Sequence, residues 1–200
     1  MKRIPFEYAV LAISVGVTFA VATPARAQTS AVTDSKRIET SAEKLARGKY
    51  LVTVAGCNDC HTPWVMGPKG PEPDMSRMLS GHPENEKLPP PPAPQGPWLM
   101  AAAATNTAHS GPWGISYTAN LTPDAETGLG KWTQRNFTET IRTGRHMGRG
   151  RQILPPMPIP MYKHFTDADL EAIFSYLQTI PAGKNRVPEP LPATLPVAAK

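Results

Sequence analysis

Apolar side chains recur at helical spacing in three separate parts of the chain. In the first of these, a stripe runs from Leu45 to about Ala55. Thr40 precedes it and Glu43 follows Thr40 by three positions, which is the pattern of a helix-capping box. The pattern predicts a helix over about 41–55.

The clearest helical pattern follows Thr166, which is suited to be an N-cap residue. The apolar positions keep the i, i+3, i+4, i+7 spacing of one buried helix face: Leu170, Ile173, Phe174 and Leu177. Pro181 then stops the helix. The pattern predicts a helix that buries one face against the rest of the protein.

A shorter helix of about ten residues is predicted after Thr133, another residue suited to be an N-cap. Phe137 and Ile141 lie four positions apart there, and Gly144 follows them as a natural end.

The region between the helix predicted over 41–55 and the helix predicted after Thr133 is rich in proline. Ten of the thirty residues from Pro68 to Pro97 are proline, including Pro89 to Pro92 in a row. Proline disrupts helix interiors, so 63–112 is expected to be a long surface insertion, either a spacer or a segment that binds a partner. Residues 98–132 are expected to be a covering loop, and no β-hairpin signal is evident. The fold class predicted from these patterns is all-α with long proline-rich loops.

Composition narrows the function classes. The formal net charge is +5 without any long basic run, so nucleic acid is not an expected partner. Two cysteines in 200 residues exclude a scaffold held by many disulfides.

The N-terminus has the pattern of an export signal. Basic residues at positions 2 and 3 precede the apolar stretch 8–22, and an A-x-A site ends at Ala27. The predicted organisation is a signal peptide over 1–27, a flexible lead-in over 28–40, a folded domain over 41–180 and an extended tail over 181–200. An uncleaved N-terminal anchor is the alternative.

The motif that carries chemistry is C-x-x-C-H at Cys57, Cys60 and His61, the attachment sequence of a c-type haem. Two thiols three positions apart on a helical turn can each add to one vinyl group of the haem, and the next residue can then ligate its iron. One motif predicts one covalently attached haem c.

Three other interpretations of the motif fit the sequence less well. A thioredoxin-type pair would follow a strand, whereas the residues before Cys57 predict a helix. A zinc site would need a second pair of ligands, which the sequence lacks. A simple disulfide would leave His61 unexplained.

The second axial ligand of the iron is expected to be a methionine. Met157 is favoured because prolines on both sides fix its backbone, and Met161 and Met147 are the alternatives. The remaining histidines could complete a bis-His iron but are expected at the surface: His82, His109, His146 and His164.

The order of these motifs resembles that of class I c-type cytochromes. The segments 117–124, 127–132 and 161–170 are similar to the cytochrome c subunits of periplasmic alcohol, aldehyde and gluconate dehydrogenases. The resemblance covers about 45–60 and 113–180, and this chain has one haem motif where those subunits generally have more. It implies a periplasmic location, contact between the first and last helices, and His61 and Met157 as axial ligands.

The resemblance also implies a backbone carbonyl that orients His61, for which Gly67-Pro68 and Gly70-Pro71 are candidates. From their residue types, Trp132, Tyr117 and Asn120 are candidate donors to the haem propionates. Four arginines and a histidine form a basic loop before Met157, either solvated, paired with propionates or facing an acidic partner: Arg142, Arg145, His146, Arg149 and Arg151.

The predicted function is a periplasmic monohaem carrier of single electrons, not an enzyme, between a dehydrogenase or other donor and a respiratory acceptor such as a terminal oxidase. One alternative is a haem enzyme with a labile sixth ligand that acts on a small molecule. Another is a haem subunit of a dehydrogenase complex, which would allow peripheral association with a membrane.

Overall fold

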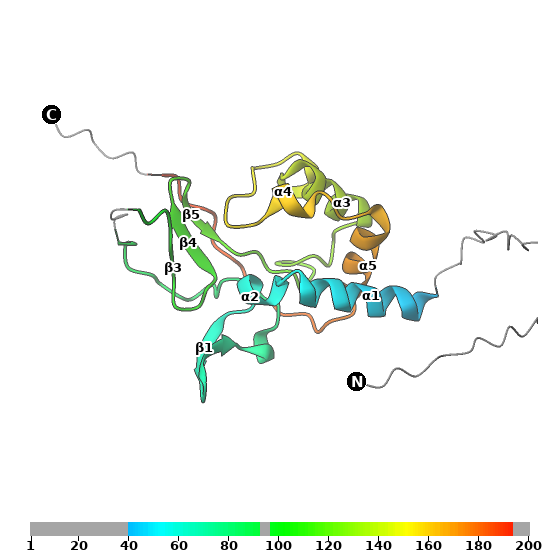
Figure 1. Cartoon of the computed structure of the whole chain (residues 1–200), viewed down its shortest axis with the longest axis horizontal. Helices are drawn as coiled ribbons and strands as arrows, with labels where there is room; N and C mark the ends of the chain where they lie inside the picture. The colour runs from blue at the N-terminus through cyan, green and yellow to red at the C-terminus, as the bar shows by residue number, and fades with distance from the viewer. Residues whose placement is uncertain (1–39, 93–96, 194–200) are drawn as a thin grey trace, which may run out of the picture. The chain divides into compact units, whose positions relative to one another are not determined.

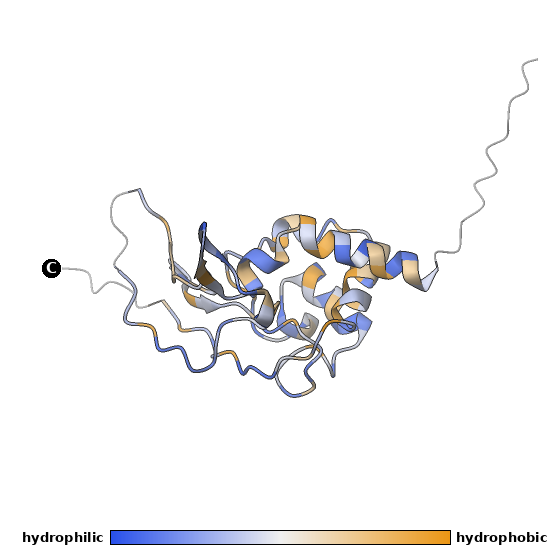
Figure 2. Ribbon diagram, turned by 90° about the horizontal axis from the view of Figure 1, so that it is seen from below, coloured by the Kyte–Doolittle hydropathy of each residue, from blue (hydrophilic) through white to orange (hydrophobic). Residues whose placement is uncertain are grey.

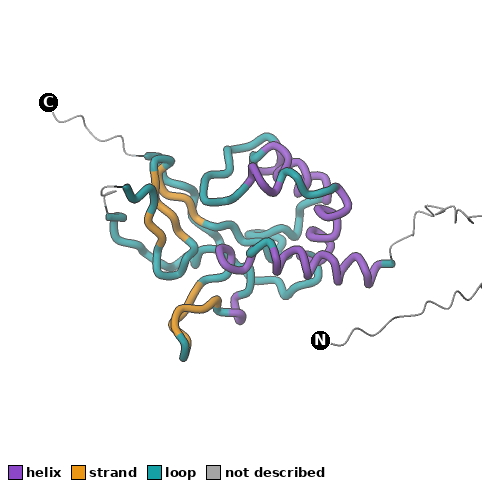
Figure 3. The backbone as a smooth tube through the Cα atoms, viewed as in Figure 1, coloured by secondary structure: helices purple, strands orange, loops and turns teal. Residues whose placement is uncertain are grey.

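The computed structural model describes residues 40–92 and 97–193. The predicted signal peptide 1–27, residues 28–39 of the predicted lead-in and residues 194–200 of the predicted tail lie outside this part. Within it, the helices gather on one side and the strands on the other, and long loops connect them (Figure 3).

The three predicted helices are confirmed as α1 (Ser41–Val54), α3 (Gln134–Thr143) and α5 (Asp167–Leu177). Each begins after a threonine whose hydroxyl accepts a hydrogen bond from the third helical residue, which closes a capping box. Two shorter helices, α2 (Cys57–His61) and α4 (Ile159–Tyr162), complete the α-helices of the described residues.

Helices α1 and α5 pack against each other, as the resemblance implied (Figure 1). Gly48 makes this approach possible, because a Cβ added there would lie 2.0 Å from the carbonyl oxygen of Ala172. The core around this contact contains Leu51, Val52, Leu170, Ile173 and Leu177. Figure 2 shows that the apolar residues concentrate on the helices, whereas the long loops are mainly hydrophilic or neutral.

The expectation of an all-α fold is wrong. The proline-rich region and the loop after it form two antiparallel sheets. The first pairs β1 (Trp64–Gly67) with β2 (Gly70–Pro73), and the second has the order β3 (Ala101–Ala102), β4 (Ala108–Gly111) and β5 (Gly114–Tyr117). The chain is therefore a mixed α and β protein.

The hairpins were missed because their signals are short and atypical. Both turns consist of two residues, Pro68-Lys69 and Pro112-Trp113, instead of the usual Asn-Gly type. Gly70 and Gly114 follow the turns with φ of 122° and 97°, values that favour glycine. Strands of four residues or fewer are too short to show a period of two.

Part of the predicted surface insertion is buried. Leu79 and His82 are 0% exposed, and His109 on β4 is 2% exposed, so the prediction that these histidines lie at the surface is wrong. The Gly81 N–H donates to the carbonyl of His61 at 2.8 Å, which places this segment beside His61. His146 and His164 are exposed, as predicted.

Residues 183–191, here called the C-terminal strap, extend from the region after α5 to strand β5. The Asn185 amide donates to the carbonyls of Ser80 at 2.7 Å and His82 at 2.8 Å. Leu191 exchanges two backbone hydrogen bonds with Ile115. The strap thus ties the helices to the sheet.

None of the helices within 40–92 and 97–193 has the length and apolar character that crossing a bilayer requires.

Candidate functional site

A cavity of about 480 Å³ lies between the helices, the loop that follows β5 and the strap. Cys57, Cys60, His61 and Met157 all line it. Its apolar walls come from α3, α5 and the loop before α3: Leu129, Phe137, Ile141, Leu170, Ile173 and Leu177. This volume lies within the range of small-molecule and cofactor sites.

The two thiols reach the cavity because the chain turns sharply at Gly56, whose φ of 69° is left-handed and permits α2 to follow α1 directly. The two cysteines do not form a disulfide with each other. Burial raises the pKa of Cys57 to about 11 and also raises that of Cys60, so both thiols are uncharged at neutral pH. A catalytic redox pair needs a lowered thiol pKa, so this environment argues against a thioredoxin-type site.

His61 is oriented by the backbone. Its Nδ1 lies 2.7 Å from the carbonyl oxygen of Ala119, where a ring N–H donates, and Nε2 has no hydrogen-bond partner among the described residues. Burial lowers the pKa of His61 more than the Ala119 carbonyl raises it. The ring is therefore neutral, with one nitrogen fixed and the other available to a ligand. The carbonyl comes from Ala119, and not from the Gly-Pro pairs at Gly67 and Gly70.

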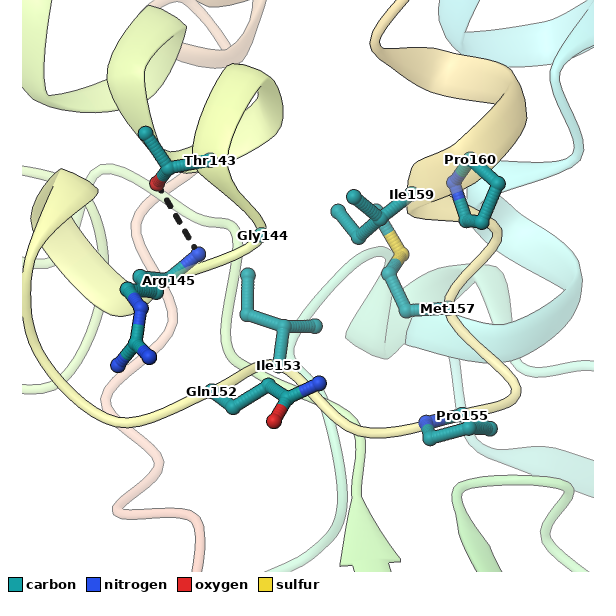
Figure 4. A pocket seen from close by; sticks show the side chains of 9 residues that line it. All are labelled: Thr143, Gly144, Arg145, Gln152, Ile153, Pro155, Met157, Ile159 and Pro160. Carbon is teal, nitrogen blue, oxygen red and sulfur yellow. Dashed lines mark hydrogen bonds between the residues drawn. The ribbon is translucent and has the colours of Figure 1, made fainter.

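Met157 enters the cavity from a loop that is tied to the sheet. The Ser116 hydroxyl donates to the carbonyl of Pro155 at 2.6 Å, two residues before the methionine. Met157 also lines a second cavity of about 360 Å³, in which the Arg145 guanidinium points away from it (Figure 4). By contrast, Met161 is 63% exposed, and neither it nor Met147 lines the larger cavity.

Trp132, Tyr117 and Asn120 also line the larger cavity. Trp132 packs edge-on against His146, and Tyr117 packs against the His82 ring. The Asn120 amide donates to the carbonyl of Gly183 at 2.8 Å, and its oxygen accepts from Thr122. Asn120 therefore holds the strap, while contact of any of the three with a cofactor stays a prediction.

The basic loop is mostly engaged with the protein itself. Arg142 pairs with Asp167 at 2.6 Å, and Arg145 donates to the carbonyl of Gly150 at 3.1 Å. Arg151 lines the larger cavity and pairs with Glu189 of the strap at 3.2 Å.

Two parts of the site were not found from the sequence. Tyr162 on α4 lines the cavity and donates its hydroxyl to the carbonyl of Ala55 at the end of α1, and burial raises its pKa to about 12. The strap supplies lining residues from 186 to 190. Both contacts depend on tertiary structure, and only the proximity of Met161-Tyr162 to Met157 offered a signal for the tyrosine.

Several known proteins with related sequences are subunits of dehydrogenases. A nicotinate dehydrogenase subunit of Pseudomonas putida is 30% identical over 176 residues, which are 84% of this chain and 12% of that protein. The fructose dehydrogenase cytochrome subunit of Gluconobacter japonicus is 27% identical over 152 residues, 73% of this chain and 24% of that subunit. The gluconate 2-dehydrogenase cytochrome c subunit of Pantoea cypripedii is 32% identical over 130 residues, 65% of this chain and 22% of that subunit.

No protein-family model matches the chain. The chain spans at most a quarter of the length of these three relatives. The predicted resemblance is nonetheless confirmed: this chain is similar to the cytochrome c subunits of dehydrogenases.

Proposed function

We propose that this chain, similar as it is to dehydrogenase cytochrome subunits, is a periplasmic electron carrier with one haem c. In this proposal, Cys57 and Cys60 would hold the haem through thioether bonds, and His61 and Met157 would ligate its iron. The electron donor is a dehydrogenase, and the electron is passed on to a respiratory acceptor.

The observation that carries this proposal is the convergence of these four side chains on a cavity of about 480 Å³. They come from two regions of the chain almost a hundred positions apart. His61 has the arrangement of a metal-ligating histidine: a carbonyl holds one ring nitrogen, and the other has no hydrogen bond to any residue that the structure describes. The donor set of an imidazole and a thioether suits a low-spin iron that transfers electrons.

When bound, haem c supplies a one-electron iron couple. The residues of the chain set the conditions for that couple. The Ala119 carbonyl holds the His61 ring in one orientation, and the Ser116–Pro155 hydrogen bond holds the Met157 loop. The apolar walls exclude water, which favours the less charged, reduced state.

The relatives support the assignment of a dehydrogenase as the donor, because the names of two of them describe cytochrome subunits of fructose and gluconate dehydrogenases. The N-terminal pattern of an export signal supports the periplasmic location.

The test is expression with the cellular machinery for haem attachment, followed by mass spectrometry of the denatured protein. We expect the mass of one haem to be retained, because thioether bonds survive unfolding. The single variants Cys57→Ser and Cys60→Ser should retain haem less completely, and the double variant should lose it on acid-acetone extraction. Extraction of all haem from the unmodified protein would refute the proposal.

A second measurement distinguishes an electron carrier from a haem enzyme. The ferric protein should show the weak red absorption band of sulfur–iron coordination, and carbon monoxide should bind the ferrous protein poorly. Rapid binding of carbon monoxide without that band would indicate an open sixth position and favour an enzyme.

A further inference from the structure

The wall that the strap adds to the cavity carries a positive charge. Arg186 lines the cavity together with Val187, Pro188, Glu189 and Pro190. This segment was expected to be part of an extended tail, and it lies more than a hundred positions after the haem motif.

The other charged residues that line the cavity can be grouped by their ion pairs. Glu126 pairs with Lys184 at 2.9 Å, and Arg151 pairs with Glu189 at 3.2 Å. His146 also lines the cavity, packed against Trp132, and burial lowers its pKa. The guanidinium of Arg186 has no ion pair within residues 40–92 and 97–193, although its backbone N–H donates to Glu84 Oε2 at 2.8 Å. Arg186 is thus an exposed lining cation whose guanidinium forms no ion pair with the described part of the chain, although the Glu84 carboxylate lies against its backbone.

The position of Arg186 is set by its neighbour. Besides the two amide bonds of Asn185 to Ser80 and His82, the Asn185 N–H donates to the hydroxyl of Thr127 at 3.0 Å. The backbone on both sides of the Asn185–Arg186 peptide is therefore fixed to the body of the protein, and the long side chain starts from a defined point.

From this arrangement we propose that Arg186 binds a propionate carboxylate of the haem. The inference rests on the proposed function, because the carboxylate belongs to the cofactor. Arginine suits this task, since its planar guanidinium can donate two parallel hydrogen bonds to one carboxylate. Arg151 is already paired, and Trp132 and Tyr117 offer only neutral donors.

The charge has a consequence for the redox couple. A cation beside the bound haem would favour the reduced state of the iron, which carries one positive charge less. It also keeps the propionate ionised by lowering its pKa. Removing the cation should lower the midpoint potential and bring the pKa of the propionate closer to neutrality.

The experiment is a redox titration of the full-length haem protein at several pH values for the unmodified protein, Arg186→Gln and Arg186→Lys. Arg135→Gln is the control, because it removes the same charge from a side chain that is 84% exposed on α3 and does not line the cavity. We expect Arg186→Gln to shift the potential downward and to make it fall with rising pH near neutrality. Arg186→Lys should retain most of the original potential, and the control should match the unmodified protein.

If Arg186→Gln fails to retain haem, Arg186→Lys becomes the deciding variant. Normal haem content in Arg186→Lys would support a role of the positive charge, and loss of haem in both variants would contradict that role. Potentials and pH profiles of Arg186→Gln that match those of Arg135→Gln would overturn the inference. Absence of covalent haem from the unmodified protein would instead refute the proposed function.

Discussion

At the scale of single residues, His61 shows how burial keeps an imidazole neutral. A histidine in water is partly protonated near neutral pH, and a protonated ring cannot bind a metal. Burial lowers the pKa of His61, and the Ala119 carbonyl fixes the ring. His61 is therefore a neutral imidazole held in one orientation, which is the form that can ligate a metal.

The assignment of Met157 can be tested by Met157→His. The iron should stay six-coordinate, but the midpoint potential should fall, because imidazole stabilises ferric iron more than a thioether does. The red sulfur–iron band should disappear, which absorption spectroscopy and a redox titration would record together.

Met161→Leu serves as the control, because Met161 is 63% exposed and does not line the cavity. It should leave both the band and the potential in place. If it removed the band while Met157→His preserved it, Met161 would be the ligand.

The sequence predicts the side chains that are proposed to carry chemistry, but not the backbone groups that support them. The two cysteines, His61 and Met157 were predicted together, and the structure brings them to a shared cavity. The Ala119 carbonyl was missed because every residue has a carbonyl group, so residue type says nothing about which one faces an imidazole.

At the scale of elements, helices were predictable where local signals coincided. The capping threonines and the spacing of apolar residues located α1, α3 and α5. In the hairpins, no two local signals coincide, because Gly and Pro are abundant there and the strands are very short. Their stability comes from packing and pairing that a local pattern does not record.

The contact between α1 and α5 can be tested by Gly48→Val. The new side chain would collide with the backbone of Ala172, which cannot move without separating the helices. We expect a loss of about 1–3 kcal/mol in the free energy of unfolding, measured with urea. Ala46→Val is the matched control, since Ala46 is exposed on the same helix and should lose well under 1 kcal/mol, roughly its helix propensity.

The start of α5 should make stability depend on pH. Burial acts to raise the pKa of Asp169, but hydrogen bonds from Thr166 and Arg47 outweigh it and lower that pKa overall. Arg47 Nη2 lies 2.6 Å from the carboxylate, whose side chain is 12% exposed. A group with a lowered pKa in the folded state stabilises above its unfolded pKa near 4, and this contribution is lost as pH falls through the folded value.

Asp169→Asn should therefore lower stability at pH 7 by about 1–2 kcal/mol and flatten the loss of stability between about pH 5 and 3. Thermal unfolding at pH 7 would show the loss of stability, and thermal unfolding between about pH 5 and 3 would show the flatter profile. Asp167→Asn is the control, because its side chain is 87% exposed and its ion pair should contribute little. An acid profile of Asp169→Asn parallel to that of the unmodified protein would contradict the expectation.

At the scale of the whole molecule, the strap connects parts that are far apart in sequence. Residues 181–200 were predicted only as an extended tail, because they contain several prolines and no periodicity. The hydrogen bonds that fix residues 183–191 are made by single side chains to distant carbonyls, and no local pattern predicts such partners.

Asn185→Ala tests how much the strap contributes to stability. The carbonyls of Ser80 and His82 would both lose a donor, so we expect a loss of about 1–3 kcal/mol in urea unfolding and faster proteolysis of the strap. Lys184→Ala removes only an ion pair whose side chains are 69% and 59% exposed, and should cost under about 1 kcal/mol. Equal losses in the two variants would show that the Asn185 amide is not the main anchor.

The strap also sets the order in which the cavity can be completed. Ser80 and His82 precede Asn185 by 105 and 103 positions, so nearly all of the folded part must be synthesised before these bonds can form. Until then, the cavity lacks the wall that residues 186–190 provide. Completion of the cavity wall therefore depends on contacts between residues about a hundred positions apart, and not on any local structure of the strap itself.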